Sequence, residues 1–254
     1  MQKNNIWIIT LLAAVFTACG GTKPTKLTQQ NTTDRNTRLL EKGVSFFAYG
    51  QEPFWNLEVY EGKEIKFEGM NNQSFVSPSK VELPTDSNPY YTIFRKNVPN
   101  GAFQLVILHQ PCTDLMSGEK HPMWIIAYNG TDTLKGCGMN IYDKRINGNW
   151  KLVKIKGKKI SSKLSPDNIP HLEINGELNT LSGSTGCNRF NGKFVLRNYK
   201  VHMGDLVTTK MACQNTIELA FLDAFKHIDS YQIKENNLFL TNKLGVTCEF
   251  IKTE

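Results

Sequence analysis

The residues of this chain whose types could support chemistry are mainly cysteines and histidines. His109 and Cys112 are three residues apart, and His121 and Cys137 follow them. These side chains could bind zinc, although structural zinc sites use closer pairs, such as two cysteines separated by two residues. Cys112 beside a histidine could also be a nucleophile, which requires a free thiol of low pKa near a base. Both uses require reduced cysteines, so an oxidising compartment favours a disulfide instead.

Carboxylates and a glycine-rich segment form two further patterns. Glu52 and Asp114 could pair as acid and base in glycoside chemistry, but a turn role for Glu52 before Pro53 is the simpler interpretation. Residues 182–186 read Ser-Gly-Ser-Thr-Gly, which lacks the nucleophile pattern Gly-x-Ser-x-Gly. No Lys-Ser/Thr pair follows, as a phosphate-binding loop requires. We therefore predict that the protein is not an enzyme and has no catalytic residue, metal or cofactor.

The N-terminus has the pattern of an export signal. Lys3 precedes an apolar run from Ile6 to Phe16, which at about 11 residues is too short to span a bilayer and fits a secretory signal. Cys19 follows two small residues, and this arrangement resembles a bacterial lipobox, although Phe16 stands where leucine is usual. The resemblance implies that residues 1–18 are a signal peptide and that Cys19 is lipidated. An ordinary signal peptide with an incidental cysteine is the alternative.

Composition and charge agree with an exported globular protein. The chain has 254 residues, of which 40% are hydrophobic and 21% charged, and a net charge of +7. These values exclude a collagen, a polytopic membrane protein and a long coiled coil. In an exported protein, excess positive charge points to anionic envelope surfaces rather than to nucleic acid.

Changes in composition divide the chain behind the signal. Residues 19–42 are polar and without aromatic side chains, as in a flexible tether carrying the lipid anchor. Residues 43–144 contain short apolar runs separated by proline and glycine, which predicts a β-barrel-like domain. A break near residues 143–148 separates it from a second domain at 145–254. The predicted fold class is mainly β, with two small antiparallel β-rich domains.

The second domain is predicted to be α+β with one amphipathic helix at about 216–228. Apolar residues recur there with helical spacing, and Asn215 and Glu218 are placed as a capping pair. A hairpin is expected around residues 235–237. Alternation near the end of the chain turns Cys248 inward.

The second half resembles the META domain family, also called HslJ-like. The motifs that carry the resemblance are Gly-Asn-Trp-Lys-Leu at 148–152, Leu-Ser-Gly-Ser-Thr-Gly-Cys-Asn-Arg-Phe-Asn-Gly at 181–192 and Thr-Thr-Lys-Met-Ala-Cys at 208–213. The resemblance implies a compact antiparallel β-structure with one helix. It also implies a bacterial envelope lipoprotein linked to heat shock or antibiotic tolerance, without established catalytic activity.

The first half resembles a second family of envelope proteins. The residues that carry this resemblance are Gly-Gln-Glu-Pro-Phe-Trp at 50–55, Cys-Thr-Asp-Leu-Met-Ser at 112–117 and Gly-Cys at 136–137. This signature often accompanies proteins that resemble small periplasmic inhibitors of lysozyme. Leu115 stands where glycine is expected, so the loop there is expected to differ.

Lipidation of Cys19 leaves five cysteines for the two domains. Cys112 and Cys137 form the natural bridge of the first domain. The second domain has an odd count, and Cys187–Cys213 is favoured because the two META motifs that carry these residues each contain a cysteine. Cys187–Cys248 is the alternative, and the third thiol stays free.

These observations predict a non-enzymatic, periplasm-facing lipoprotein, with the outer membrane preferred to the inner. Cys19 would bind the membrane, and the domains would support envelope integrity or stress tolerance by binding an envelope protein or an anionic envelope component. Inhibition of a lysozyme-like cell-wall hydrolase through the first domain is the alternative function. The candidate binding residues are Glu52, Phe54, Trp55, Asn188 and Arg189. Aromatic residues at 54–55 are nevertheless typical of a core, and Asn188 is suited to bonding its own loop.

Overall fold

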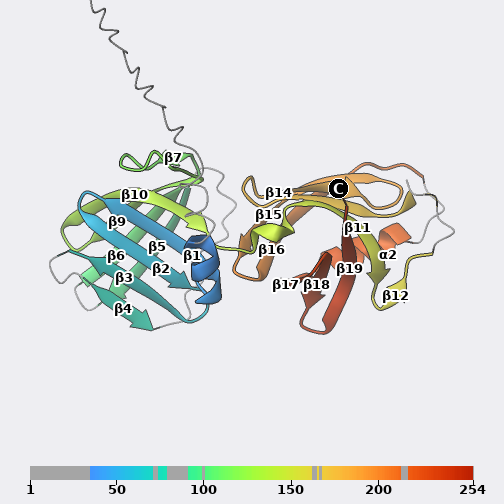
Figure 1. Ribbon diagram of the computed structural model, residues 1–254, viewed down its shortest axis with the longest axis horizontal. Coiled ribbons are helices and arrows are strands. Elements are labelled where there is room, and N and C mark those ends of the chain that lie inside the picture. The colour runs from blue at the N-terminus through green and yellow to red at the C-terminus, as the bar shows by residue number, and fades with distance from the viewer. Residues whose placement is uncertain are drawn as a thin grey trace, which may run out of the picture.

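The computed structural model describes residues 35–70, 74–78, 91–98, 101–161, 165, 168–212 and 217–253. Two large β-sheets lie side by side along the long axis of the molecule (Figure 1), and a third sheet has the two short strands β7 (Cys112–Thr113) and β8 (Lys120–His121). The prediction of a mainly β fold with two β-rich domains is confirmed. Among the described residues, no helix has the length and apolar character needed to cross a membrane.

The first sheet is antiparallel, with the strand order β4-β3-β2-β1-β10-β9-β6-β5. Its strands are β1 (Phe46–Gln51), β2 (Phe54–Tyr60), β3 (Glu64–Gly69), β4 (Phe75–Pro78), β5 (Tyr91–Val98), β6 (Gly101–Leu108), β9 (Met123–Asn129) and β10 (Asp132–Asn140). Every second residue of β2, β6 and β9 is buried, as the period of a strand requires when one face covers a core. The buried aromatic residues of this core are Phe46, Trp55, Phe67, Phe75 and Phe103.

The second sheet closes on itself. Its order is β12-β11-β13-β14-β15-β16-β17-β18-β19, and β11 also pairs with β19. The strands are β11 (Gly148–Ile155), β12 (Lys158–Lys159), β13 (His171–Asn175), β14 (Thr180–Ser184), β15 (Arg189–Arg197), β16 (Lys200–Thr208), β17 (Ser230–Lys234), β18 (Asn237–Asn242) and β19 (Gly245–Thr253). The predicted hairpin is β17–β18, and Cys248 is buried as expected.

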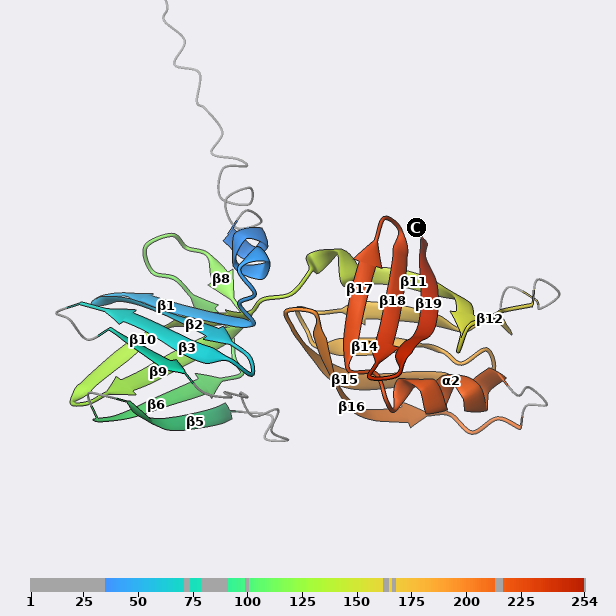
Figure 2. The ribbon, with the colours of Figure 1, turned by 90° about the horizontal axis from the view of Figure 1, so that it is seen from below.

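One α-helix, α2 (Ile217–Phe225), packs against the second sheet (Figure 2). It buries Phe221, Ala224 and Phe225, and the ring centroids of Phe190 and Phe221 are 5.7 Å apart. The apolar spacing therefore predicted the buried face correctly, although the helix ends three residues before the predicted Ile228. Asn215, the predicted N-cap, lies outside the described residues.

The segment before the first sheet differs from the prediction. Residues 35–41 are helical, so the expected flexible tether is wrong for this part of residues 19–42. Leu39 and Leu40, two apolar residues on one helical turn, pack against Val44 and Ile141 and form a small buried cluster with them. The Asn198 side chain, between β15 and β16, donates to the carbonyls of Leu40 and Val44 at 3.4 and 3.2 Å.

Candidate functional site

The connection between β6 and β9 is a compact loop braced by a disulfide. This disulfide-braced loop (residues 111–122) contains two short paired strands, β7 (Cys112–Thr113) and β8 (Lys120–His121). Cys112 is bonded to Cys137 on β10, which confirms the predicted bridge. Because both thiols are oxidised, neither can bind zinc or act as a nucleophile.

Asp114 orders the loop from within. Its carboxylate Oδ1 accepts hydrogen bonds from the backbone N–H groups of Met116 and Ser117, at 2.8 and 3.1 Å. Burial alone would raise the pKa of Asp114, but these hydrogen bonds lower it by a larger amount. The pKa therefore lies below its ordinary value, and the carboxylate is ionised. The turn leaves Leu115 and Met116 outside, with 96% and 72% of their surfaces exposed. Asp114 is therefore a structural residue rather than the acid–base partner of Glu52.

A cluster of polar side chains supports the loop. The Tyr49 hydroxyl and Nε2 of His121 are hydrogen-bonded at 2.8 Å. Arg35 lies over the Tyr49 ring, 5.3 Å from its centroid, and pairs with Glu119 at 3.8 Å. Burial, and then the charge of Arg35, lower the pKa of His121 to about 4, while burial raises that of Tyr49. Both side chains are therefore uncharged at neutral pH, and the cluster fixes the loop.

Trp55 belongs to the interior of the first domain. It is fully buried, and its indole N–H donates to the Lys135 carbonyl at 3.1 Å. Two glycines make room for it: a Cβ at Gly50 would lie 2.2 Å from Nε1 of Trp55, and one at Gly136 would lie 2.0 Å from the Tyr49 carbonyl oxygen. This burial favours the core role that is typical of such an aromatic residue over the binding role that was considered for Trp55.

Phe54 and Glu52 lie at the surface instead. The Phe54 side chain is 53% exposed and Glu52 is also exposed. Phe54 and the equally exposed Met70 line a shallow hollow of about 280 Å³, together with Asp132 and Thr133. The alternation of β2 explains this division, since neighbouring residues of a strand point to opposite faces.

Asn188 joins three elements of the second domain. Its Nδ2 donates to the Glu218 carboxylate of α2 at 2.9 Å, and its Oδ1 accepts from Oγ1 of Thr209 and the backbone N–H of Met211 at 2.8 and 2.7 Å. Asn188 is buried. Its side chain therefore bonds mainly to other elements rather than to its own loop, and these contacts favour a structural role for Asn188 over the predicted binding role. Its neighbour Arg189 is exposed.

The second domain has three cysteines, so at least one of them was expected to stay free. Cys187 is disulfide-bonded, and Cys248 is a free, buried thiol. The alternative pairing of Cys187 with Cys248 is therefore wrong. The favoured partner, Cys213, lies outside the described residues. Burial raises the pKa of Cys248 to about 12, so its thiol is protonated and inert.

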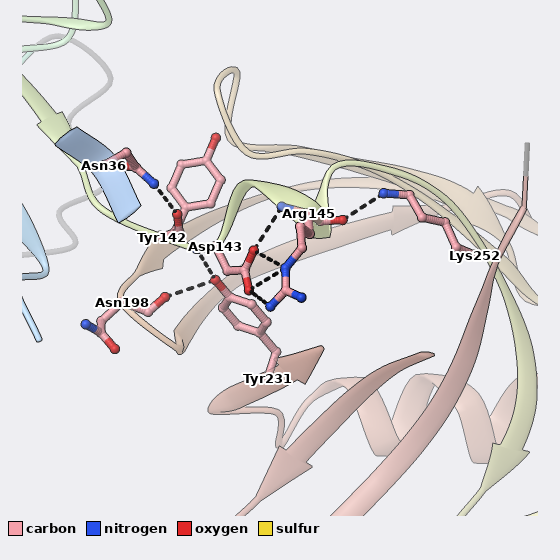
Figure 3. A network of polar contacts seen from close by, with 7 residues as sticks. All are labelled: Asn36, Tyr142, Asp143, Arg145, Asn198, Tyr231 and Lys252. Atoms are coloured by element: carbon pink, nitrogen blue, oxygen red, sulfur yellow. Dashed lines mark hydrogen bonds and ion pairs between the residues drawn. The ribbon is translucent and has the colours of Figure 1, made fainter. Parts of the chain in front are cut away.

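The two domains meet along a junction segment (residues 141–147) that is bonded on both sides. The Ile141 carbonyl accepts from the backbone N–H of Asn198 at 2.5 Å. The Tyr142 carbonyl accepts from Nδ2 of Asn36 at 3.0 Å, as Figure 3 shows. The segment that joins the domains is thus part of the folded structure.

Aromatic and charged side chains complete the junction. The backbone N–H of Asp143 donates to the Tyr231 hydroxyl at 2.9 Å, and this hydroxyl donates to the Asn198 carbonyl at 3.0 Å (Figure 3). The Arg145 guanidinium binds the Asp143 carboxylate, with a shortest distance of 2.6 Å. Nζ of Lys252 donates to the Arg145 carbonyl at 2.9 Å, so the last strand is also attached.

A buried charge cluster crosses the same junction. Glu61, from the turn after β2, lies 3.6 Å from Nη1 of Arg197 and 3.3 Å from Nε2 of His202. The side chains of Glu61 and Arg197 are only 4% and 7% exposed. Burial raises the pKa of Glu61, but the hydrogen bond and charge of His202, followed by Arg197, lower it more, so it stays below its ordinary value. We call these three residues the Glu61 cluster.

The basic stretch on β11 and β12 is partly neutralised. Lys154 pairs with Glu249, and Lys156 pairs with Asp223 of α2 at 2.6 Å. Lys156 and Asp223 are also at the edge of a hollow of about 600 Å³ beside the end of α2. Within the described part of the chain, no group of three or more His, Cys, Asp or Glu side chains is arranged to hold a metal ion.

Comparison with known proteins concerns the second domain. Residues 144–254 match the family model of the META domain. The region that matches META includes α2, the Asn188 network and the closed sheet. No curated protein is a significant match to the chain. The resemblance of the first half to a lysozyme-inhibitor-like family therefore stays a prediction.

Two solved structures also match part of the chain. One, described only as the NMR structure of a protein, is 22% identical, covers 41% of this chain and 88% of its own, and has a TM-score of 0.34. The other, from Burkholderia xenovorans, is 28% identical, covers 42% of this chain and 82% of its own, and has a TM-score of 0.35.

The sequence patterns did not predict the Glu61 cluster. They also did not predict the polar side chains that support the disulfide-braced loop, which are Arg35, Tyr49, Glu119 and His121. Glu61 and Arg197 are 136 residues apart, and no local pattern links two residues at that separation. A local signal did exist for Asp114, since aspartate followed by residues of a tight turn is typical of a side chain that accepts from its own backbone.

Proposed function

We propose that the protein is a non-enzymatic lipoprotein of the bacterial envelope, anchored through a lipidated Cys19 and facing the periplasm, with the outer membrane preferred. The observation that carries this proposal is the match of residues 144–254 to the META domain, which favours a non-catalytic protein of the envelope type. The disulfide at Cys112–Cys137 supports it, because such bridges persist outside the cytoplasm.

In this role the two domains act by binding, either to another envelope protein or to an anionic component of the envelope, and so support envelope integrity or stress tolerance. The polar side chains of the META motif support this interpretation, since Asn188 and Glu218 bond each other and stabilise the fold. The surfaces left for binding are therefore exposed loops such as residues 111–122 and the hollow beside Phe54.

Metabolic labelling with radioactive palmitate tests the anchor. The wild-type protein should incorporate label and sediment with membranes, whereas Cys19→Ala should lose both properties. Cys248→Ala is the matched control, because it removes a cysteine that is buried and unpaired, and it should keep the label. An unlabelled wild-type protein would contradict the proposal. Crosslinking in intact cells followed by mass spectrometry would then identify the bound component.

A further inference from the structure

We propose that the tip of the disulfide-braced loop, formed by Leu115 and Met116, inserts into the phospholipid surface to which Cys19 anchors the chain. This inference rests on the proposed function for the anchor itself. It adds a second point of membrane contact, made by the folded domain, and thereby assigns one face of the molecule to the bilayer.

The first observation is the exposure of two adjacent apolar side chains on a rigid support. Leu115 and Met116 are 96% and 72% exposed. The loop that carries them is held by the Asp114 carboxylate, by the backbone bond from Asp114 to the Glu119 carbonyl at 2.8 Å, and by the disulfide. Since the loop is already ordered, insertion of its tip requires little further loss of conformational entropy. Apolar side chains are stabilised when they leave water for the acyl boundary of a bilayer.

The second observation is the place where the described chain begins. Arg35 contacts the loop directly, through its ion pair with Glu119 and its position over Tyr49. Figure 2 shows the helix at residues 35–41 next to the loop, in agreement with these contacts of Arg35. Cys19 lies sixteen residues before Arg35, a length that reaches at most about 55 Å when fully extended. The anchor therefore keeps this face of the first domain close to the membrane.

The third observation is the charge around the tip. The loop has two carboxylates, and both are turned away from solvent: Asp114 is 5% exposed, and the Glu119 side chain is 17% exposed and paired with Arg35. Lys120 is exposed, and 40% of the Arg35 side chain is accessible. The cations beside the apolar tip are therefore more exposed than the carboxylates, an arrangement that suits a surface meeting anionic headgroups.

The size of the tip favours a lipid surface over a protein partner. A stable protein interface buries about 800 Å² on each side, which two side chains do not supply. Two side chains are enough to orient a protein that a lipid chain already holds at the membrane, because the second contact is then intramolecular. The fatty-acyl anchor and the loop tip would act as the paired signals that stable membrane association requires.

Tryptophan fluorescence of the full-length lipidated protein tests this proposal. Leu115→Trp and Leu244→Trp are each reconstituted in vesicles of phosphatidylethanolamine and phosphatidylglycerol with brominated acyl chains. Leu244 is the matched control, because it is also 96% exposed but lies in the turn between β18 and β19 of the second domain. The wild-type signal is subtracted to isolate the introduced indole. Leu115→Trp should show blue-shifted emission that bromine quenches, and Leu244→Trp should show neither effect.

Each other result decides against the proposal. Water-like emission of Leu115→Trp, quenched no more than that of Leu244→Trp, would overturn the loop contact while leaving the anchor intact. An indole at position 115 that is shielded only after lysozyme is added would assign the loop to a protein instead. Failure of the wild type to incorporate palmitate would remove the anchor and with it the loop contact, and the labelling experiment detects that outcome separately.

Discussion

Trp55 owes its position to residues that lack side chains. Its indole crosses β1 and β10 at Gly50 and Gly136, where any Cβ would overlap the ring or the backbone beside it. The adjacent Phe54 points to the other face and is solvent-exposed. The Glu-Pro-Phe-Trp sequence thus combines one core residue and one surface residue, and its resemblance to a family motif alone does not separate the two roles.

Gly136→Ala should destabilise the first domain by about 3 kcal/mol, because an added methyl group forces β10 away from β1 in a packed core. Urea denaturation followed through tryptophan emission measures the change. Gly118→Ala is the control: this glycine has a φ of +71°, and a Cβ there meets nothing within 4 Å, so only the backbone cost of about 1 kcal/mol applies. Equal losses at the two positions would contradict the packing argument.

Residue type alone predicted the disulfide of the first domain but not the roles of Trp55 and Asn188. Two cysteines in one domain predicted the Cys112–Cys137 bond, because that bond requires a specific partner type. Trp55 and Asn188 are ambiguous in sequence, since the same side chains serve a core and a binding surface. Only their burial, which depends on strands and loops distant in the chain, decides between the two uses.

Among the elements, α2 shows how a helix is attached to a closed sheet. Its apolar face covers the core, and its first turn is fixed by the Glu218 carboxylate, which accepts from Asn188 at 2.9 Å and from Oγ1 of Thr185 at 3.2 Å. Asn188 also bonds the segment after β16 through Met211. One buried amide therefore ties the loop before β15, the end of β16 and the helix together.

Asn188→Ala should lower the stability of the second domain by about 3 kcal/mol, because several buried partners are left unsatisfied. Thermal denaturation measures the loss, and hydrogen exchange should show α2 opening first. The matched control is Asn175→Ala, whose exposed side chain accepts from the backbone N–H groups of Glu177 and Leu178, with an expected cost below about 1 kcal/mol. A loss at Asn188 no larger than at Asn175 would refute this interpretation.

Element-level prediction succeeded where the apolar period is strong. The spacing from Ile217 to Phe225 was sufficient for α2, and alternation was sufficient for β17, β18 and β19. The helix at residues 35–41 was missed because only two apolar residues, Leu39 and Leu40, define its buried side. Its partners, Val44 and Ile141, come from the two ends of the first domain, so its stability depends on tertiary packing rather than on local pattern.

Across the whole molecule, the Glu61 cluster and the junction segment join the two domains. The carboxylate of Glu61 comes from the first domain, and its partners Arg197 and His202 come from the second. Lys200 adds a further positive charge. Because the depressed pKa of Glu61 means that the folded state favours the ionised carboxylate, its contribution to stability is present above the ordinary pKa of 4.5 and is lost as the pH falls through the folded-state value.

Glu61→Gln should therefore cost about 3 kcal/mol at pH 7, since it removes the buried carboxylate charge that lies 3.6 Å from the Arg197 guanidinium. The difference from wild type should shrink as the pH falls below about 4.5, the ordinary pKa of a glutamate. Urea denaturation across this pH range measures it. Glu64→Gln, which removes a partly exposed pair with Lys66, is the control and should cost at most about 1 kcal/mol at any pH. A pH-independent cost at Glu61 would refute the assignment.

The contact of Asn198 with Leu40 and Val44 has a mechanical consequence. The segment that leads from the helix at residues 35–41 into β1 lies at the junction between the domains, where the Asn198 side chain of the second domain donates to its carbonyls. A force applied to the chain before residue 40 acts on both domains, because the hydrogen bonds of Asn198 to Leu40 and Val44 resist the force before it reaches β1. Force applied at the N-terminal side of the first sheet would then be shared with the second domain instead of acting on β1 alone.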